Sequence, residues 1–176
     1  MSACSRLALA ALYVSALPAA ALTTVDIAYL EETRPPVTTL ANLEPPPADL
    51  GRAGVELGIR DNDSTGKFLQ QRFQLHSIQL PVGTPASEWL ARLNKSKARL
   101  VVANLPSATL EALLKQPGQD GVLWFNAGSA DDALRQSRCR PNLLHTLPGR
   151  AMQADALAQY LVARRWKKWF LVTGPQ

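Results

Sequence analysis

Short apolar runs alternate with segments of helical periodicity along most of the chain. Apolar runs of roughly four to eight residues, bounded by charged or turn-forming residues, predict β-strands. The expected strands are residues 25–30, 73–80, 100–103, 122–125, 143–147 and 169–172. The second strand alternates apolar and polar residues, which indicates a sheet edge, whereas the continuous apolar run 100–103 is typical of a buried parallel strand.

Helices are predicted between these strands, because apolar residues recur there at spacings of three and four. The expected helices begin near Ala48, Pro85, Ser107 and Asp131, and a last one spans 151–166. Gly51, Gly54 and Gly58 each cost the first helix about 1 kcal/mol relative to alanine, so we expect them to permit a close approach of helix to sheet. The polar run 61–66 is expected to end this helix in a turn, and Gly118 to end the third helix.

Six strands, of which the first five are each followed by a helix, predict an α/β fold. The expected architecture is a three-layer parallel sheet with helices on both faces and a flavodoxin-like strand order. Such sheets bind ligands at the carboxyl ends of their strands, where helix amino termini offer unpaired N–H groups. The loops after Leu30, Ala103, Phe125 and Leu147 are therefore the first places to look for function.

The amino terminus has the order of a bacterial secretory signal. Arg6 precedes the apolar run 7–14, and Ala19 and Ala21 form an A-x-A cleavage site. The alternative is a membrane anchor, but the run is shorter than the roughly 20 residues that a spanning helix needs, and a proline interrupts it. The predicted organisation is a signal peptide over 1–21 and one periplasmic domain over 22–176.

Charge and cysteine content exclude some classes of function. The net charge is +5, and loss of Arg6 with the signal leaves +4. A small excess spread along an exported chain is not typical of a nucleic-acid-binding protein. Cys4 leaves with the signal, so Cys139 remains alone and cannot form a disulfide within the chain. We interpret Cys139 as a small loop residue; the alternative, a thiol nucleophile, lacks a neighbouring base in the sequence.

Essentially the whole mature sequence resembles a known family. The run 50–69 is similar to the first helix and following turn of type I periplasmic solute-binding proteins, as are the loop 126–129 and the segment 149–155 that enters the fifth helix. The chain most resembles the branch of ABC-transporter substrate-binding proteins associated with pyrroloquinoline-quinone-dependent alcohol oxidation. The residues that resemble this branch are 29–31, 61–62, 131–135, 139–142 and 155–158.

The resemblance implies a function as well as a fold. Proteins of this family have two α/β lobes that close over a small solute, and the chain spans about half of a typical member. Gly174 and Pro175 lie about where the first lobe would end, which implies an amino-terminal lobe. The implied role is non-enzymatic and needs no cofactor. The implied partners are a small-molecule solute and, where a second lobe is present, the membrane subunits of an ABC importer.

The ligand-binding residues are expected at the ends of the first, third and fourth strands. They are Tyr29, Leu30, Glu31, Asn104, Ser107, Asn126, Ala127, Gly128 and Ser129. Ser107 and Ser129 are candidate hydrogen-bond donors to an anionic or hydroxylated solute, and helix capping is their alternative role.

Other patterns that resemble functional sites have simpler interpretations. Neither a GxGxxG turn nor a P-loop is present, which argues against a nucleotide cofactor. His76 and His145 stand on different strands, so we expect no metal site. The run 61–66 lacks the later glutamate of a calcium loop. We interpret Asp131 and its neighbour Asp132 as residues that complement a helix dipole, and the basic and aromatic run 164–169 as a helix end with its tryptophans in the core.

Two other classes of function remain open. A small exported enzyme acting through Ser107, Ser129 or Cys139 would need a base within hydrogen-bond reach of the nucleophile. A sensory or interaction module would use the lobe as a docking surface. No catalytic residue is expected in the leading interpretation.

Overall fold

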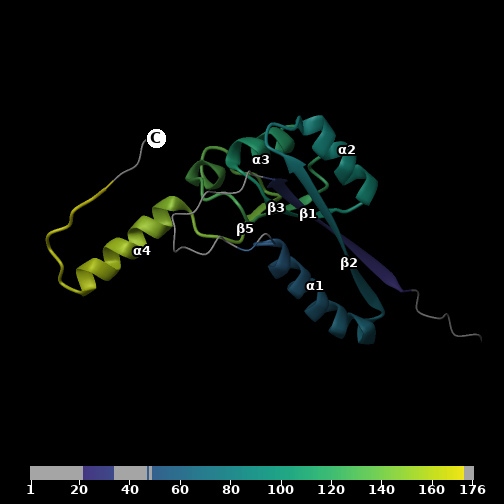
Figure 1. Cartoon of the computed structure of the whole chain (residues 1–176), viewed down its shortest axis with the longest axis horizontal. Coiled ribbons are helices and arrows are strands. Elements are labelled where there is room, and N and C mark those ends of the chain that lie inside the picture. The colour runs from purple at the N-terminus through teal and green to yellow at the C-terminus, as the bar shows by residue number, and fades with distance from the viewer. Residues whose placement is uncertain (1–21, 34–46, 48, 173–176) are drawn as a thin grey trace, which may run out of the picture.

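The computed structural model describes residues 22–33, 47 and 49–172 (Figure 1). The predicted signal peptide and the pair Gly174 and Pro175 lie outside this part of the chain. The strands are β1 (Thr23–Thr33), β2 (Gln71–Pro81), β3 (Leu100–Asn104), β4 (Leu123–Asn126) and β5 (Leu143–His145). The helices are α1 (Arg52–Gly66), α2 (Ala86–Ser96), α3 (Ser107–Leu114) and α4 (Arg150–Ala163), with 3-10 helices η1 (Lys67–Leu69) and η2 (Asp132–Arg135).

The described strands form one sheet in which every pairing is parallel. Its order is β2-β1-β3-β4-β5, and each strand is followed by a helix, which confirms the predicted three-layer α/β fold with flavodoxin-like strand order. The chain moves outward from β1 to β2 and then crosses back to β3. The carboxyl ends of β1 and β3 therefore flank the topological switch point, where sheets of this kind bind ligands.

The hydrophobic core lies between the sheet and the pair α2 and α3. Alternate residues of the central strands point into it, so Val101, Ala103 and Trp124 are inaccessible to solvent while their neighbours along the strand are half-buried. Trp89 of α2 and Leu110 of α3 belong to the same cluster. Burial of each large apolar side chain contributes roughly 1.5–3 kcal/mol, so this face holds the strand ends in place.

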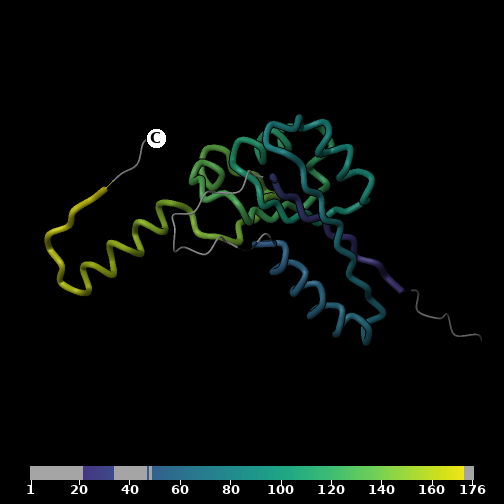
Figure 2. Tube along the Cα trace, viewed as in Figure 1, coloured from purple at the N-terminus to yellow at the C-terminus, as the bar shows by residue number. Residues whose placement is uncertain are grey.

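Helix α1 lies on the other face and packs against β2. The crossover from β1 to β2 runs in the opposite direction to the later crossovers, and right-handed connections then place its helix on the opposite side of the sheet. The two long strands β1 and β2 extend beyond the shorter ones, and α1 follows them (Figure 2). The prediction that the second strand is an edge strand is confirmed.

The predicted turn over 61–66 is wrong, because these residues form the last part of α1. Asn62 donates its side-chain amide to the Gly58 carbonyl at 2.8 Å, and Ser64 donates its hydroxyl to the Asp61 carbonyl at 2.6 Å. The polar side chains thus bond to the backbone of the helix itself instead of breaking it. The helix continues through η1 and stops at Gln70, which has a left-handed backbone with φ 55°.

The close approach of helix to sheet that we expected at these three glycines is absent at two of them, Gly54 and Gly58. A Cβ atom at Gly54 or Gly58 would meet no atom within 4 Å. The close contact is at Gly51, just before the helix, and it involves residues of the strand tips described below.

The predicted sixth strand is wrong. Residues 169–172 pair with no strand, and Leu171 and Val172 are each 81% exposed. The preceding helix α4 has no buried residue and extends away from the sheet (Figure 1). Trp166 and Trp169 are 59% and 55% exposed, so the expectation that they belong to the core is also wrong. Apolar sequence predicted a strand here, but the described part of the chain supplies no neighbour for it to pair with.

In the part of the chain that the structure describes, no helix combines the length and apolar character that crossing a membrane requires.

Candidate functional site

The carboxyl ends of β1, β3 and β4 bring most of the predicted site residues to one edge of the sheet. Tyr29, Leu30 and Glu31 lie on β1, Asn104 ends β3, Ser107 begins α3, Asn126 ends β4, and Ala127, Gly128 and Ser129 form the loop after it. Glu31 is the register partner of Asn104, and Ala103 is the partner of Asn126. The parallel register therefore aligns these strand ends.

A polar cluster occupies the switch point between β1 and β3. The Asn104 side-chain amide donates to the Tyr29 hydroxyl at 3.0 Å and to the Glu31 carboxylate at 3.3 Å. The other carboxylate oxygen of Glu31 accepts a hydrogen bond from Gln79 of β2 at 2.8 Å. We call Tyr29, Glu31, Gln79 and Asn104 the tip cluster. Sequence reasoning missed Gln79, although the register that pairs it with Glu31 follows from the alignment of the two strands.

The phenol of Tyr29 is neutral, and its surroundings favour that form further. Its side chain is almost fully enclosed, and burial is the main cause that raises the pKa of Tyr29. The hydrogen bond from Asn104 and the charge of Arg52 act in the opposite direction, while Glu31 raises the pKa further. A neutral phenol can both accept from Asn104 and donate to another group.

Gly51 closes the tip cluster from the α1 side. Its backbone has φ 92°, and a Cβ atom there would lie 2.7 Å from the Tyr29 hydroxyl and 3.0 Å from the Asn104 amide nitrogen. Only glycine combines this backbone conformation with such a close approach. Sequence reasoning connected Gly51 with the sheet but not with the site.

The loop after β4 is shaped by the side chain of Asn126, which is completely buried. Its carbonyl oxygen accepts from the backbone N–H of Ser129 at 2.9 Å and of Gly128 at 3.3 Å, and its amide donates to the Ser129 carbonyl at 2.7 Å. A Cβ at Gly128 would lie 2.5 Å from the Leu105 nitrogen, so this loop rests directly on the backbone after β3. We call residues 127–129 the tip loop.

Three of the predicted site residues, Leu30, Ser107 and Ser129, do not have all the contacts that the sequence led us to expect. Leu30 is completely buried in the core. Neither serine caps a helix through its side chain: α3 has no such cap, and the Ser129 hydroxyl accepts from the Asp131 N–H at 3.3 Å. Asp131 itself caps η2 by accepting from the Ala133 N–H at 3.1 Å.

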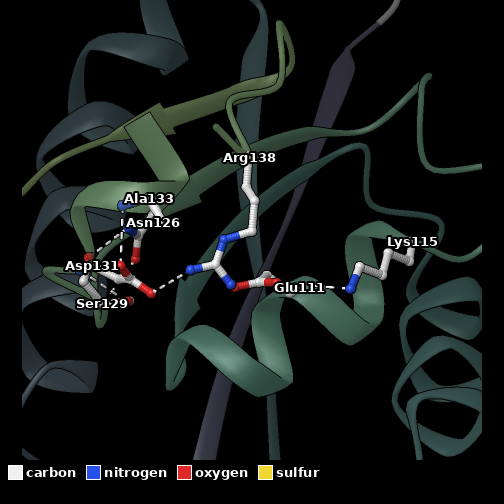
Figure 3. Close-up of polar contacts among 7 residues, drawn as sticks. All are labelled: Glu111, Lys115, Asn126, Ser129, Asp131, Ala133 and Arg138. Carbon is white, nitrogen blue, oxygen red and sulfur yellow. Dashed lines mark hydrogen bonds and ion pairs between the residues drawn. The ribbon is translucent and has the colours of Figure 1, made fainter. Parts of the chain in front are cut away.

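An ion-pair group lies beside the tip loop (Figure 3). Arg138 bridges the carboxylates of Glu111 on α3 and Asp131, the latter at 3.1 Å, and Lys115 lies 3.8 Å from Glu111. The Ala133 N–H is the main cause that lowers the pKa of Asp131, and Arg138 lowers it further. Sequence reasoning assigned no role to Arg138 or Glu111, because their contact depends on how the loop after η2 returns to α3.

A surface hollow of about 530 Å³ lies along this group and is lined by Ser107, Glu111, Lys115 and Arg138, among others. Both carboxylates are already paired with Arg138. The group therefore connects the loop after β4 to α3, while in the tip cluster Gln79 is exposed and Glu31 and Asn104 are half-buried.

The two histidines lie on different strands, as expected, and each has a polar partner. His76 on β2 lies 2.7 Å from the Asp26 carboxylate on β1, and His145 on β5 lies 3.0 Å from the Asn126 amide. Cys139 is exposed. Among the described residues, no group of three His, Cys, Asp or Glu side chains is placed to hold a metal ion.

The site combines hydrogen-bond donors and acceptors at the topological switch point of the sheet. Gly51 lies close against Tyr29 and Asn104 there. No hydrogen bond joins a histidine to Ser107, Ser129 or Cys139 within the described ranges. The donors and acceptors of the tip cluster suit hydrogen bonding to a polar molecule. Comparison with models of protein families gave no match, and comparison with curated proteins gave none either.

Proposed function

We propose that the chain is the solute-binding lobe of an extracytoplasmic binding protein that serves an ABC-type importer. The observation that carries the proposal is the bridging of Tyr29 and Glu31 by Asn104 at the switch point. The sequence resemblance to type I periplasmic solute-binding proteins supports the same function. The proposed link to pyrroloquinoline-quinone-dependent alcohol oxidation rests on that resemblance.

The tip cluster favours a hydroxylated solute over an anion. Glu31 carries a negative charge whose hydrogen-bond partners, Asn104 and Gln79, are neutral amides. A second anion beside it would be repelled, whereas a hydroxyl can donate to the Glu31 carboxylate and accept from the side-chain amide of Asn104 or of the exposed Gln79. Recognition by several hydrogen bonds also discriminates against apolar molecules, because a buried polar group left without a partner costs about 1–3 kcal/mol.

Transport in this proposal depends on closure of two walls around the solute. The lobe supplies one wall, and a second lobe or another polypeptide supplies the other. Closure follows when the solute has a higher affinity for the closed arrangement than for the open one. The closed form is then the one that the membrane subunits of the importer recognise.

A thermal-shift screen with alcohols, aldehydes, carboxylates and amino acids tests the proposal. We expect hydroxylated solutes to raise the melting temperature of the wild type and of Asn94→Ala, an exposed asparagine on α2, but not of Asn104→Ala. Recovery of the bound solute unchanged separates binding from catalysis, which would consume it. No shift from any class, or an equal shift in Asn104→Ala, contradicts the proposal.

A further inference from the structure

We propose that His145 is a positioning residue that holds the tip loop in shape as a neutral imidazole protonated on Nε2. The inference deepens the proposed function, because it concerns the loop that would face the solute. It rests first on the orientation of the Asn126 side chain, which lies beside His145 across the pairing of β4 and β5.

The backbone fixes which way the Asn126 amide points. Its Oδ1 faces the two N–H groups of Gly128 and Ser129, and its Nδ2 faces the Ser129 carbonyl. The flipped orientation would set two donors against the side-chain nitrogen and an acceptor against the side-chain oxygen. Asn126 therefore has one arrangement that satisfies its neighbours.

This arrangement determines the tautomer of His145. One hydrogen of Nδ2 goes to Ser129, and the other points at Nδ1 of His145, 3.0 Å away. Nδ1 must accept, so the proton of the neutral ring is on Nε2, which is buried without a hydrogen-bond partner. A proton on Nδ1 would face the amide hydrogen of Asn126 and break the contact.

The charges around the ring oppose its protonation. Arg135 of η2 lies near it and is positive, and burial of the imidazole is the main cause that lowers the pKa of His145, with Arg135 adding to it and the Leu134 backbone opposing it. The acidic neighbours on this side have other partners: Asp131 bonds the Ala133 N–H and Arg138, and Asp132 accepts from the Ala151 N–H.

Protonation would therefore act on the tip loop through Asn126. When Nδ1 gains a proton, Asn126 must turn or move, and the N–H groups of the tip loop lose their acceptor. The proposed solute site would then lose one of its walls in acid. The loop stays ordered at neutral pH, where the ring is uncharged.

Long-range ¹H–¹⁵N spectroscopy of the labelled chain reads this state without any solute. The chain has two histidines, so His76, which pairs with Asp26, is an internal reference. We expect the His145 ring to be the Nε2–H tautomer at pH 7.5, and its titration to coincide with a change in the Ser129 amide resonance. An Nδ1–H tautomer, or an imidazolium at pH 7.5, overturns the inference.

Hydrogen exchange at the Ser129 amide gives the second measurement. After correction for intrinsic pH dependence, protection is expected to fall about tenfold between pH 7.5 and a pH below the His145 titration midpoint found in the spectra, as loss of a bond of about 1.4 kcal/mol implies. His145→Gln should abolish this change, whereas His76→Gln should keep it. If His145→Gln does not fold, the tautomer in the wild type still decides. Protection that is equal at both pH values overturns the inference, and a solute screen without hits contradicts only the proposed function.

Discussion

Single residues decide whether the strand tips form a site. Asn104 and Asn126 use their amides differently: Asn104 of β3 bonds both Tyr29 and Glu31 of β1, whereas Asn126 shapes a loop. The sequence predicted both positions because polar residues follow apolar strands there. Gln79, Gly51 and His145 escaped prediction, because their roles depend on register, on a left-handed backbone and on a cross-strand neighbour respectively.

Replacing Gly51 with alanine tests the close approach at the tip cluster. We expect Gly51→Ala to lower the unfolding free energy by about 1–3 kcal/mol, since its φ of 92° and the 2.7 Å approach to Tyr29 both disfavour a Cβ. Gly54→Ala is the matched control and should be neutral or stabilise by about 0.5–1 kcal/mol, because it lies in open space within α1. Denaturant unfolding measures both, and equal effects would contradict the assignment.

The lowered pKa of His145 makes the stability of the fold depend on pH. The pKa of its folded state lies below the ordinary value of 6.5, so the folded chain binds fewer protons than the unfolded chain in that range. The stability that results from this difference in pKa is fully present above pH 6.5, and it is lost as the pH falls through the lower pKa of the folded state. Between pH 7.5 and pH 5, the unfolding free energy of the wild type should therefore fall more steeply than that of His145→Gln. Parallel curves would contradict it.

At the level of elements, the spacing of apolar residues predicted the five strands of the sheet and the helices between them. The boundaries predicted from polar residues were less accurate. Residues 61–66 look like a turn, yet side-chain bonds to the helix backbone keep them helical. The alternation of strands and helices predicted a parallel sheet with right-handed crossovers, and the observed strand order agrees with the expected flavodoxin-like order. The loop after η2 could not be predicted, since its position depends on the pairing of Arg138 with Glu111.

Removal of Arg138 tests that pairing. Glu111 is buried, and Arg138→Ala would leave its carboxylate with Lys115 alone, at 3.8 Å. We expect Arg138→Ala to lower the melting temperature more than Arg92→Ala, which removes an exposed pair with Glu88 on α2. Equal melting temperatures for the two variants would show that the ion-pair group does not hold the loop onto α3.

The whole molecule consists of a packed sheet body and a helix that projects from it. The first turn of α4 is held at the strand tips, where the Arg150 N–H donates to Ala130 and the Ala151 N–H donates to Asp132. Beyond this turn, α4 and residues 164–172 bury no side chain. The sequence predicted a buried helix and strand here because it is apolar, but burial requires a neighbour that the described chain does not supply.

Truncation tests the independence of α4. A chain that ends at Gln153 keeps the first turn, and we expect its melting temperature to change by less than about 3 °C, which corresponds to roughly 1 kcal/mol. Leu110→Ala in the core is the comparison and should cost about 2–5 kcal/mol, because Leu110 is completely buried. A loss on truncation as large as that of Leu110→Ala would mean that α4 packs on the body.

Solute binding at the strand tips is the central claim, and an amide chemical-shift titration of the labelled chain tests it most directly. With the hydroxylated solutes of the screen, the account predicts shifts at residues 29–31, 104–105 and 127–129. Shifts confined to the hollow beside Glu111 and Arg138 or to α4, or no shifts at all, would contradict it.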